Sequence, residues 1–161
     1  MDYPGDQVAD IFIKLGITHV VWLPDSAIGA WEQAFQRAGQ LKLVRVCREG
    51  EAWAIAAGLH LAGLRPLVVI QNTGLFESGD ALRNVLFDLG LPLLALIGYR
   101  NYLVPQSPDT TLRFTEPILD AWELDYVVVR SSADLTKMEK LFRACHAARR
   151  PGVVLLGEGP T

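Results

Sequence analysis

The sequence predicts an open, doubly wound α/β domain, with a mostly parallel sheet and helices on both faces. Three observations predict this fold. Short runs of β-branched and aliphatic residues alternate with longer segments whose apolar residues have helical spacing. The short runs are apolar on both faces, as are the strands of a parallel sheet that helices cover. Polar or glycine-containing residues directly follow several of these runs, where domains of this class bind their ligands.

The alternation continues along the whole chain. Residues 7–15 have apolar side chains at helical spacing, and residues 18–23 form a compact apolar run typical of a buried strand. Asp25 or Ser26 can cap the next helix, which Gly39 ends. A glycine-containing turn is expected after residue 71 and a longer loop at residues 100–113. Further strands are expected at residues 41–46, 66–71, 92–98, 126–129 and 153–156, and further helices at residues 49–62, 78–89, 116–122 and 135–149.

Size and composition are those of one domain, residues 1–161, because half of the residues are hydrophobic and can bury a sizeable core. The formal net charge of -3, without any basic stripe, gives no reason to expect nucleic acid. Neither a leader-like start nor an apolar run long enough to cross a bilayer is evident, so we expect a cytoplasmic protein without membrane contact. His and Cys residues do not have the spacing of metal ligands, so we assign none.

The most informative segment covers residues 48–58 and reads Arg-Glu-Gly-Glu-Ala-Trp-Ala-Ile-Ala-Ala-Gly. It places a carboxylate in the first turn of a helix, directly after a strand. A helix dipole favours a negative charge there by roughly 0.3–1 kcal/mol, so Glu49 and Glu51 can both be ordinary acids of a helix N-terminus. The small residues that follow indicate close helix packing.

Three other groups of residues have two interpretations each. The turn at residues 71–75, Gln-Asn-Thr-Gly-Leu, offers amides and a hydroxyl to a ligand, or else caps a helix. Asp25 and Ser26 either cap a helix or face a substrate. Arg48 and Arg100 can pair with an anionic substrate or be ordinary surface charges.

Taken together, these segments resemble the pyrimidine-binding domain of thiamine diphosphate-dependent decarboxylases, particularly sulfopyruvate and phosphonopyruvate decarboxylases. The resemblance covers nearly the whole chain and rests on the order and spacing of its parts. Those parts are residues 21–26 (Val-Trp-Leu-Pro-Asp-Ser), 48–49 (Arg-Glu), 57–58 (Ala-Gly), 71–75, 92–94 (Pro-Leu-Leu), 98–100 (Gly-Tyr-Arg), 105–106 (Pro-Gln) and 117–121 (Pro-Ile-Leu-Asp-Ala).

The resemblance implies a role for each group. Glu49 would be the catalytic acid that activates the cofactor, because counting back from Gly58 matches it, and not Glu51, to the family's glutamate. The implied cofactor-binding residues are Glu49, Gln71, Asn72, Thr73 and Gly74, and the implied substrate-binding residues are Asp25, Ser26, Arg48 and Arg100. The chain departs from the family at residues 76–77, where Phe-Glu replaces the usual Gly-Asn. An acid there would disfavour a dianionic substrate, which leaves the identity of the 2-oxo acid open.

The resemblance also implies thiamine diphosphate and Mg²⁺. The diphosphate and its Mg²⁺ need oxygen ligands from a Gly-Asp-Gly element followed by Asn. In this chain Gly79-Asp80 lacks both the second glycine and the Asn. The function expected is therefore the alpha subunit of a split 2-oxo-acid decarboxylase. A diphosphate-binding beta subunit would complete the site, and pyrimidine domains would pair in a heterotetramer or a larger assembly.

Three alternatives are open. A carboligase subunit would use the same cofactor to join two carbonyl compounds. A non-catalytic scaffold subunit would retain only the fold, and the presence of Glu49 argues against it. A nucleotide-binding module of the flavodoxin type would need a glycine-rich phosphate loop, and the sequence has none.

Overall fold

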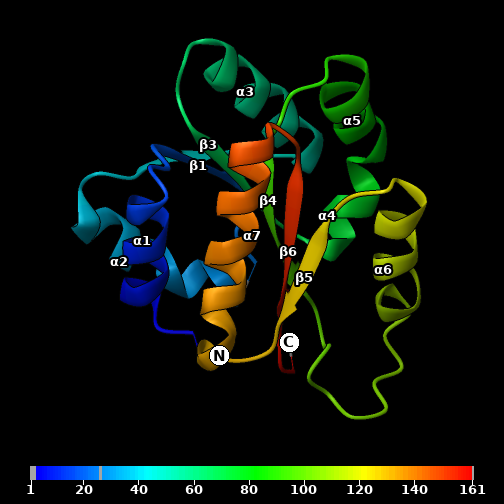
Figure 1. Ribbon diagram of the computed structural model, residues 1–161. Coiled ribbons are helices and arrows are strands. Elements are labelled where there is room, and N and C mark those ends of the chain that lie inside the picture. The colour runs from blue at the N-terminus through cyan, green and yellow to red at the C-terminus, as the bar shows by residue number, and fades with distance from the viewer. Residues whose placement is uncertain (1–2, 26, 161) are drawn as a thin grey trace.

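The computed structural model describes residues 3–25 and 27–160, and these residues contain six strands in one sheet (Figure 1). Every neighbouring pair of strands is parallel, and the order is β2-β1-β3-β4-β6-β5. The strands are β1 (His19–Trp22), β2 (Lys42–Arg45), β3 (Pro66–Gln71), β4 (Leu94–Tyr99), β5 (Tyr126–Val129) and β6 (Gly152–Gly157). The expected parallel α/β sheet is therefore confirmed.

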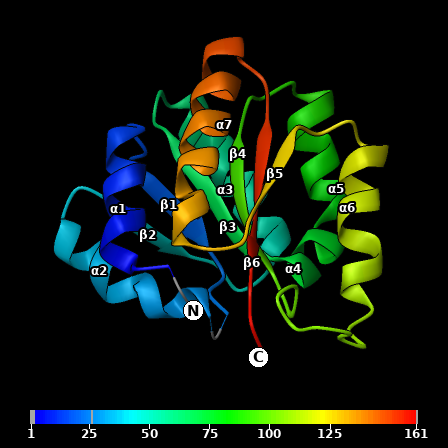
Figure 2. The ribbon, with the colours of Figure 1, turned by 60° about the horizontal axis from the view of Figure 1, so that its bottom comes forward.

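Helices cover both faces of the sheet (Figure 1 and Figure 2). One face carries α1 (Gly5–Lys14), η1 (Ile28–Trp31), α2 (Glu32–Ala38) and α7 (Leu135–Ala148), which η3 (Ser132–Asp134) precedes. The other face carries α3 (Glu49–Leu61), α4 (Asn72–Glu77), α5 (Gly79–Arg83), η2 (Asn84–Asp88) and α6 (Thr111–Ala121). None of the helices in the described part of the chain has the length and apolar character needed to cross a membrane.

The strands contribute side chains to two separate cores, one under each helical layer. Val20 and Val69 belong to the first core, whereas their neighbours Val21 and Ile70 belong to the second. Each fully buried aliphatic or aromatic side chain contributes roughly 1.5–3 kcal/mol to folding. Because successive strand residues point to opposite faces, two apolar cores explain why the strands have no polar side.

The region after β3 differs from the expected turn followed by one helix. Helix α4 begins directly at Asn72, and the expected helix at residues 78–89 is divided into α5 and the π turn η2. The break lies at Ser78, whose hydroxyl donates to the carbonyl oxygen of Gly74 (2.6 Å) and accepts from Trp53 Nε1 (3.0 Å). These buried bonds hold the chain in place between the two helical segments.

Helix α6 also begins earlier than expected, at Thr111 instead of residue 116. The Asp109 carboxylate accepts hydrogen bonds from both the backbone N–H (3.0 Å) and the hydroxyl (2.8 Å) of Thr111. An acid that binds the first helical residue supplies a partner for a backbone donor that the helix itself cannot satisfy. The polar loop therefore ends at Thr110.

The sheet has a switch point between β1 and β3. The segment after β1 forms η1 and α2 on one face, whereas the segment after β3 forms α4 and α5 on the other. Connections that leave in opposite directions open a crevice at the carboxyl ends of two neighbouring strands, where open α/β sheets bind ligands. Figure 2 turns this edge of the sheet, near the C-terminus, toward the viewer.

Candidate active site

Acidic and amide side chains follow four strands at the carboxyl edge of the sheet. Asp25 follows β1, Glu49 opens α3 after β2, Gln71 ends β3, and Glu158 follows β6. Because all six strands are parallel, these four positions share one edge. Ser26, which the sequence also selects, lies outside the described residues.

The Glu49 side chain lies across Gly74. A Cβ atom at Gly74 would overlap Glu49 Cγ and would lie 2.5 Å from Oε1 and 2.7 Å from Cδ. Real Cβ atoms essentially never have such contacts, so the side chain can take this path only because residue 74 has none. Two motifs that are far apart in the sequence are therefore in direct contact.

Glu49 and Glu51 have different environments, although both lie in the first turn of α3. Glu51 Oε2 accepts hydrogen bonds from the backbone N–H groups of Cys47 (3.0 Å) and Arg48 (3.2 Å), as in a capping box. The carboxylate of Glu49 accepts no hydrogen bond from residues 3–25 and 27–160. Glu51 is thus the ordinary acid of a helix N-terminus, and Glu49 remains open to a donor from outside the chain.

Arg48 forms an ion pair with Glu77. Its Nε and Nη2 donate to Glu77 Oε1 (3.1 and 2.6 Å), and Glu77 Oε2 accepts from the backbone N–H of Gly50 (3.1 Å). The hydrogen bond from Arg48 is the main reason that the pKa of Glu77 is lowered. Glu77 therefore does not present an uncompensated charge near the site, and Arg48 is already engaged. The pair is exposed and adds little stability.

Asp25 connects the two strands of the switch point. Its Oδ1 accepts hydrogen bonds from the backbone N–H groups of Ala27 (2.8 Å) and Ile28 (2.7 Å) at the start of η1. Its Oδ2 accepts from Gln71 Nε2 (3.0 Å), and Gln71 Oε1 accepts from the Thr73 hydroxyl (3.0 Å). Three predicted site residues thus form one hydrogen-bonded chain across the crevice.

Glu158 is an acid that the sequence analysis did not select. It is fully buried, and neither carboxyl oxygen has a hydrogen-bond donor within the described residues. A Cβ at Gly98 would overlap Glu158 Oε1 and would lie 3.0 Å from Asp25 Oδ2, so the two acids meet above this glycine. Its position directly after the last strand, in Gly157-Glu158-Gly159, was the signal that would have selected it.

Burial, and next the charge of Asp25, raise the pKa of Glu158 to about 8. Burial disfavours the ionised form of a carboxyl group, and a carboxylate neighbour disfavours it further. Arg100 acts in the opposite direction, without cancelling these effects. The protonated form of Glu158 is therefore favoured beside the Asp25 carboxylate.

Two predicted ligands have partners inside the domain. The Asn72 side chain is fully buried and its Nδ2 donates to Thr115 Oγ1 (3.0 Å), which links α4 to α6 beneath the surface. Arg100 Nε donates to Asp109 Oδ2 (2.8 Å), and this hydrogen bond is the main reason that the pKa of Asp109 lies well below its ordinary value. Asn72 therefore has a structural contact, whereas the outer nitrogens of Arg100 have no hydrogen-bond partner within residues 3–25 and 27–160.

No family model matches the sequence. Over 156 residues the chain is 27% identical to the sulfopyruvate decarboxylase of Methanosarcina acetivorans, a match that covers 95% of this chain and 40% of the relative. It is 26% identical over 149 residues to the phosphonopyruvate decarboxylase of Streptomyces viridochromogenes, covering 89% and 36%. It is 30% identical over 95 residues to the alpha subunit of sulfopyruvate decarboxylase from Methanocaldococcus jannaschii, covering 58% and 56%.

The chain resembles the sulfopyruvate and phosphonopyruvate decarboxylases. It spans about half, or less, of the length of these relatives. Benzoylformate decarboxylase from Polynucleobacter necessarius has the same fold, with a TM-score of 0.73 and 17% identity over 96% of this chain and 30% of that one. The 2-oxoglutarate:ferredoxin oxidoreductase of Magnetococcus marinus gives a TM-score of 0.69 at 16% identity, over 95% and 28%. The expected thiamine diphosphate-binding fold is thus confirmed.

The edge that holds Glu49 fits the pyrimidine part of that cofactor. An aminopyrimidine ring carries nitrogen atoms that can donate to a carboxylate, and Glu49 is the partly buried carboxylate of this edge that lacks a donor. Because Gly74 has no Cβ, the Glu49 side chain has room to lie across it. The described residues contain no group of three or more His, Cys, Asp or Glu side chains that could hold a metal ion.

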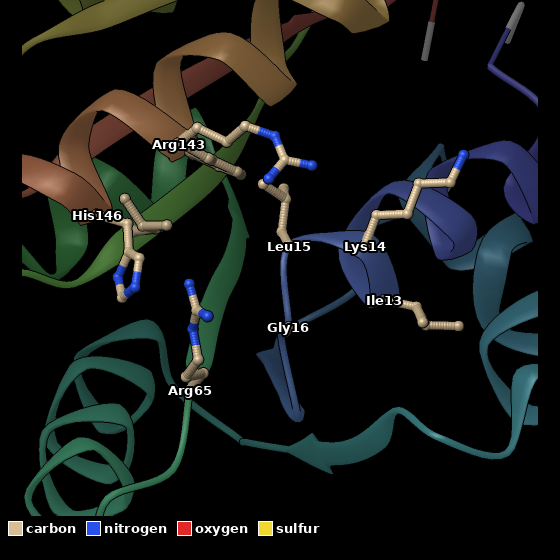
Figure 3. Close-up of a pocket in the computed structure, with 9 residues that line it drawn as sticks. Ile13, Lys14, Leu15, Gly16, Arg65, Arg143 and His146 are labelled. Atoms are coloured by element: carbon tan, nitrogen blue, oxygen red, sulfur yellow. The ribbon is translucent and has the colours of Figure 1, made fainter.

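A basic pocket lies at the opposite, amino-terminal edge of the sheet (Figure 3). It has a volume of about 330 Å³, and Lys14, Arg65, Arg143 and His146 contribute to its lining. Burial, and then the charge of Arg65, lower the pKa of His146. The pocket contains no predicted site residue, so it is distinct from the candidate active site.

Proposed function

We propose that this chain is the pyrimidine-binding subunit of a thiamine diphosphate-dependent 2-oxo-acid decarboxylase. The observation that supports this most strongly is the Glu49 carboxylate, which lies across Gly74 at the carboxyl edge and has no hydrogen-bond donor in the described chain. The resemblance to decarboxylases and the shared fold support the same reaction class.

Glu49 would hold the ring nitrogen N1′ of the cofactor's aminopyrimidine and would keep a proton at that atom. Its position at the first residue of α3 favours the negative charge that this role requires. When bound, thiamine diphosphate supplies the electron sink that accepts the electron pair left by departing carbon dioxide. The protein groups orient the substrate and control protons around that chemistry.

Asp25 and Arg100 are the proposed contacts for the substrate, a small 2-oxo acid. Asp25 lies at the switch point, and its carboxylate is held by N–H donors from two segments. Within the described residues Arg100 is bound through Nε alone, so its outer nitrogens can bind a carboxylate or another acidic group of the substrate.

A second polypeptide would complete the site by holding the diphosphate and Mg²⁺. The sequence has no Gly-Asp-Gly element with the downstream Asn, and a hard cation needs such oxygen ligands. Two of the relatives are themselves named as alpha subunits. Both observations support a heterooligomer that places Glu49 at the contact between the two chains.

Pyrimidine-binding subunits would also associate with each other. Large apolar side chains are exposed on and after the helices of one face: Ile55 and Leu61 in α3, Phe87 in η2, and Leu89 just beyond it. Helix α3 packs against α5 and η2, so these side chains belong to one group of neighbouring elements. Exposed apolar clusters of this kind commonly mark protein interfaces.

The test is to co-express the chain with a candidate diphosphate-binding subunit and to measure carbon dioxide release from a panel of 2-oxo acids. The substitution Glu49→Gln keeps the shape and removes the charge, so we expect kcat to fall by about 10²-fold or more. Glu51→Gln is the matched control, because it makes the same charge change two residues away and glutamine still serves in a capping box.

Equal loss in both variants would show that only the total charge of the helix end matters. Full activity in Glu49→Gln would reject the catalytic role and favour a scaffold subunit. Product analysis separates the remaining alternative, because a carboligase would release a joined product where a decarboxylase releases an aldehyde.

A further inference from the structure

Glu158 has an environment that a charged carboxylate does not tolerate. The side chain is fully buried, and neither oxygen receives an N–H or O–H from the described residues. Burying an ionised carboxylate without donors is far more costly than burying a neutral carboxylic acid. Either Glu158 has a proton, or it would require a donor that this part of the chain does not contain.

The group beside Glu158 is itself an acid. Asp25 and Glu158 meet above Gly98, which has no side chain to separate them. Asp25 receives three N–H groups, from Ala27, Ile28 and Gln71. Because its negative charge is stabilised and that of Glu158 is not, the proton belongs on Glu158, whose O–H can then donate to Asp25.

The other charged group facing this pair is Arg100, at the end of β4. Its Nε is bound to Asp109, which offsets much of its positive charge. On the helical side the neighbour is apolar: Ile28 Cδ1 would lie 3.0 Å from a Cβ placed on Gly98, close to where the two acids meet. Among the described residues, therefore, the pair is balanced by one partly neutralised arginine.

We infer that Glu158 keeps its proton at neutral pH and donates it in a hydrogen bond to the Asp25 carboxylate, so that Glu158 is the positioning residue of the pair and the partly exposed Asp25 is the group through which a proton reaches the carboxyl edge. Of these two acids, the sequence selected Asp25 as a site residue and did not select Glu158. In the proposed function, on which this part rests, the electron pair that the cofactor's electron sink accepts when carbon dioxide departs would return to the substrate carbon as that carbon binds a proton. The pair of acids would supply the proton that forms the new C–H bond and would then regain one from water.

The balance of charges explains why such a pair suits this task. A pKa of about 8 for Glu158 lies close to neutral pH, and an acid of that strength is both protonated and able to release its proton. Loss of the proton leaves two neighbouring carboxylates, and Arg100 is the one positive side chain among the described residues that acts on Glu158. Reprotonation is therefore favourable after each transfer.

The test is a pH titration of the full chain, labelled with ¹³C at the glutamate carboxyl carbons and followed by NMR. We expect one glutamate signal to titrate near pH 8 and to disappear in Glu158→Gln. In Asp25→Asn the same signal should titrate at lower pH, because the amide removes a negative charge and can donate a hydrogen bond. Glu139→Gln, at a partly exposed acid of α7 that forms an ion pair with Arg143, should leave it unchanged.

Titration of Glu158 in the range of ordinary glutamates would overturn the inference, and so would a signal that Asp25→Asn does not move. The reaction offers a separate readout: in the active complex, Glu158→Gln should shift the alkaline limb of the kcat profile while the KM changes little. An unchanged profile would overturn the proton-transfer role. A complex that releases no carbon dioxide would overturn the proposed function, while the NMR result would still stand or fall on its own.

Discussion

At the scale of single residues, Gly74 and Gly98 leave the space that two acidic side chains occupy at the carboxyl edge of the sheet. Neither glycine has the positive φ that only glycine adopts readily. Their role is spatial: a Cβ at Gly74 would overlap Glu49, and one at Gly98 would overlap Glu158. The two positions therefore control where the carboxyl groups lie.

Gly74→Ala should displace the Glu49 side chain and reduce kcat of the complex by about 10²-fold, because small misplacements of reacting groups have effects of that size. Circular dichroism should show that the fold is retained. Gly58→Ala is the control within a helix: a Cβ there meets nothing within 4 Å, so the free energy of unfolding should rise by about 0.5–1 kcal/mol. Unchanged kcat in Gly74→Ala would contradict the proposed placement of Glu49.

The pKa of Glu158 also predicts how stability depends on pH. Because the folded pKa of about 8 exceeds the ordinary value of 4.5, the folded chain binds the proton more tightly than the unfolded chain between these limits. The free energy of unfolding should therefore fall as pH rises from about 4.5 to 8, by on the order of 4 kcal/mol from this group. Urea denaturation at pH 5 and pH 8.5 tests this: the loss between the two should be smaller in Glu158→Gln than in the unmodified chain.

At the scale of elements, Asp109 fixes the loop between β4 and the start of α6. It binds Arg100 Nε and Asn101 Nδ2 through Oδ2 and both donors of Thr111 through Oδ1. The contacts with Arg100 and Asn101 join residues that are apart in the sequence, and those with Thr111 depend on the rotamer of the Asp109 side chain. The sequence pattern therefore did not show that the helix starts at Thr111. The same contacts connect α6 to the proposed substrate contact Arg100.

Asp109→Asn should lower the free energy of unfolding by about 2–3 kcal/mol, because it removes a nearly buried charge that several donors require. The effect should diminish as pH falls below about 3.8, because Asp109 has a pKa below that ordinary value and its stabilising charge is lost only at strongly acidic pH. Denaturation at pH 7 is the measurement. Asp10→Asn, on an exposed position of α1, should change stability little, and equal effects in the two variants would contradict the assignment.

At the scale of the whole molecule, the parallel sheet brings the ends of β1, β2, β3 and β6 to one edge. Three large apolar side chains of one helical layer lie exposed, Ile55 and Leu61 in α3 and Phe87 in η2. A site at an edge together with an apolar outer layer is the arrangement expected of a subunit that works within an assembly.

Leu61→Lys should weaken the self-association of the purified chain, because Leu61 is 72% exposed and a charge would be buried unpaired in the proposed contact. Analytical ultracentrifugation should show a lower average mass for this variant than for the unmodified chain. Leu103→Lys, at an exposed leucine in the loop after β4, is the control. The same mass for all three proteins would contradict the proposed interface.

The sequence predicted the strands well because their signal is local: a short apolar run between glycine, proline or helical segments. It also predicted which turns lie at the carboxyl edge, and so selected Glu49, Asp25 and Gln71. It did not separate Glu51 from Glu49 on physical grounds, because both acids suit a helix N-terminus. The backbone bonds of Glu51 made that distinction.

By itself, the sequence determined the fold class, because apolar runs without a polar side favour covered parallel strands, and the helical spacing between those runs favours helices that pack on the sheet. The partners of each acid depended on the tertiary structure alone. Asp25 and Glu158 lie near opposite ends of the chain, and they meet because the loop after β1 reaches the glycine of β4 beside the end of β6. A hydrogen bond or a shared proton depends on distances of a few ångströms, and only the folded chain brings such remote groups that close.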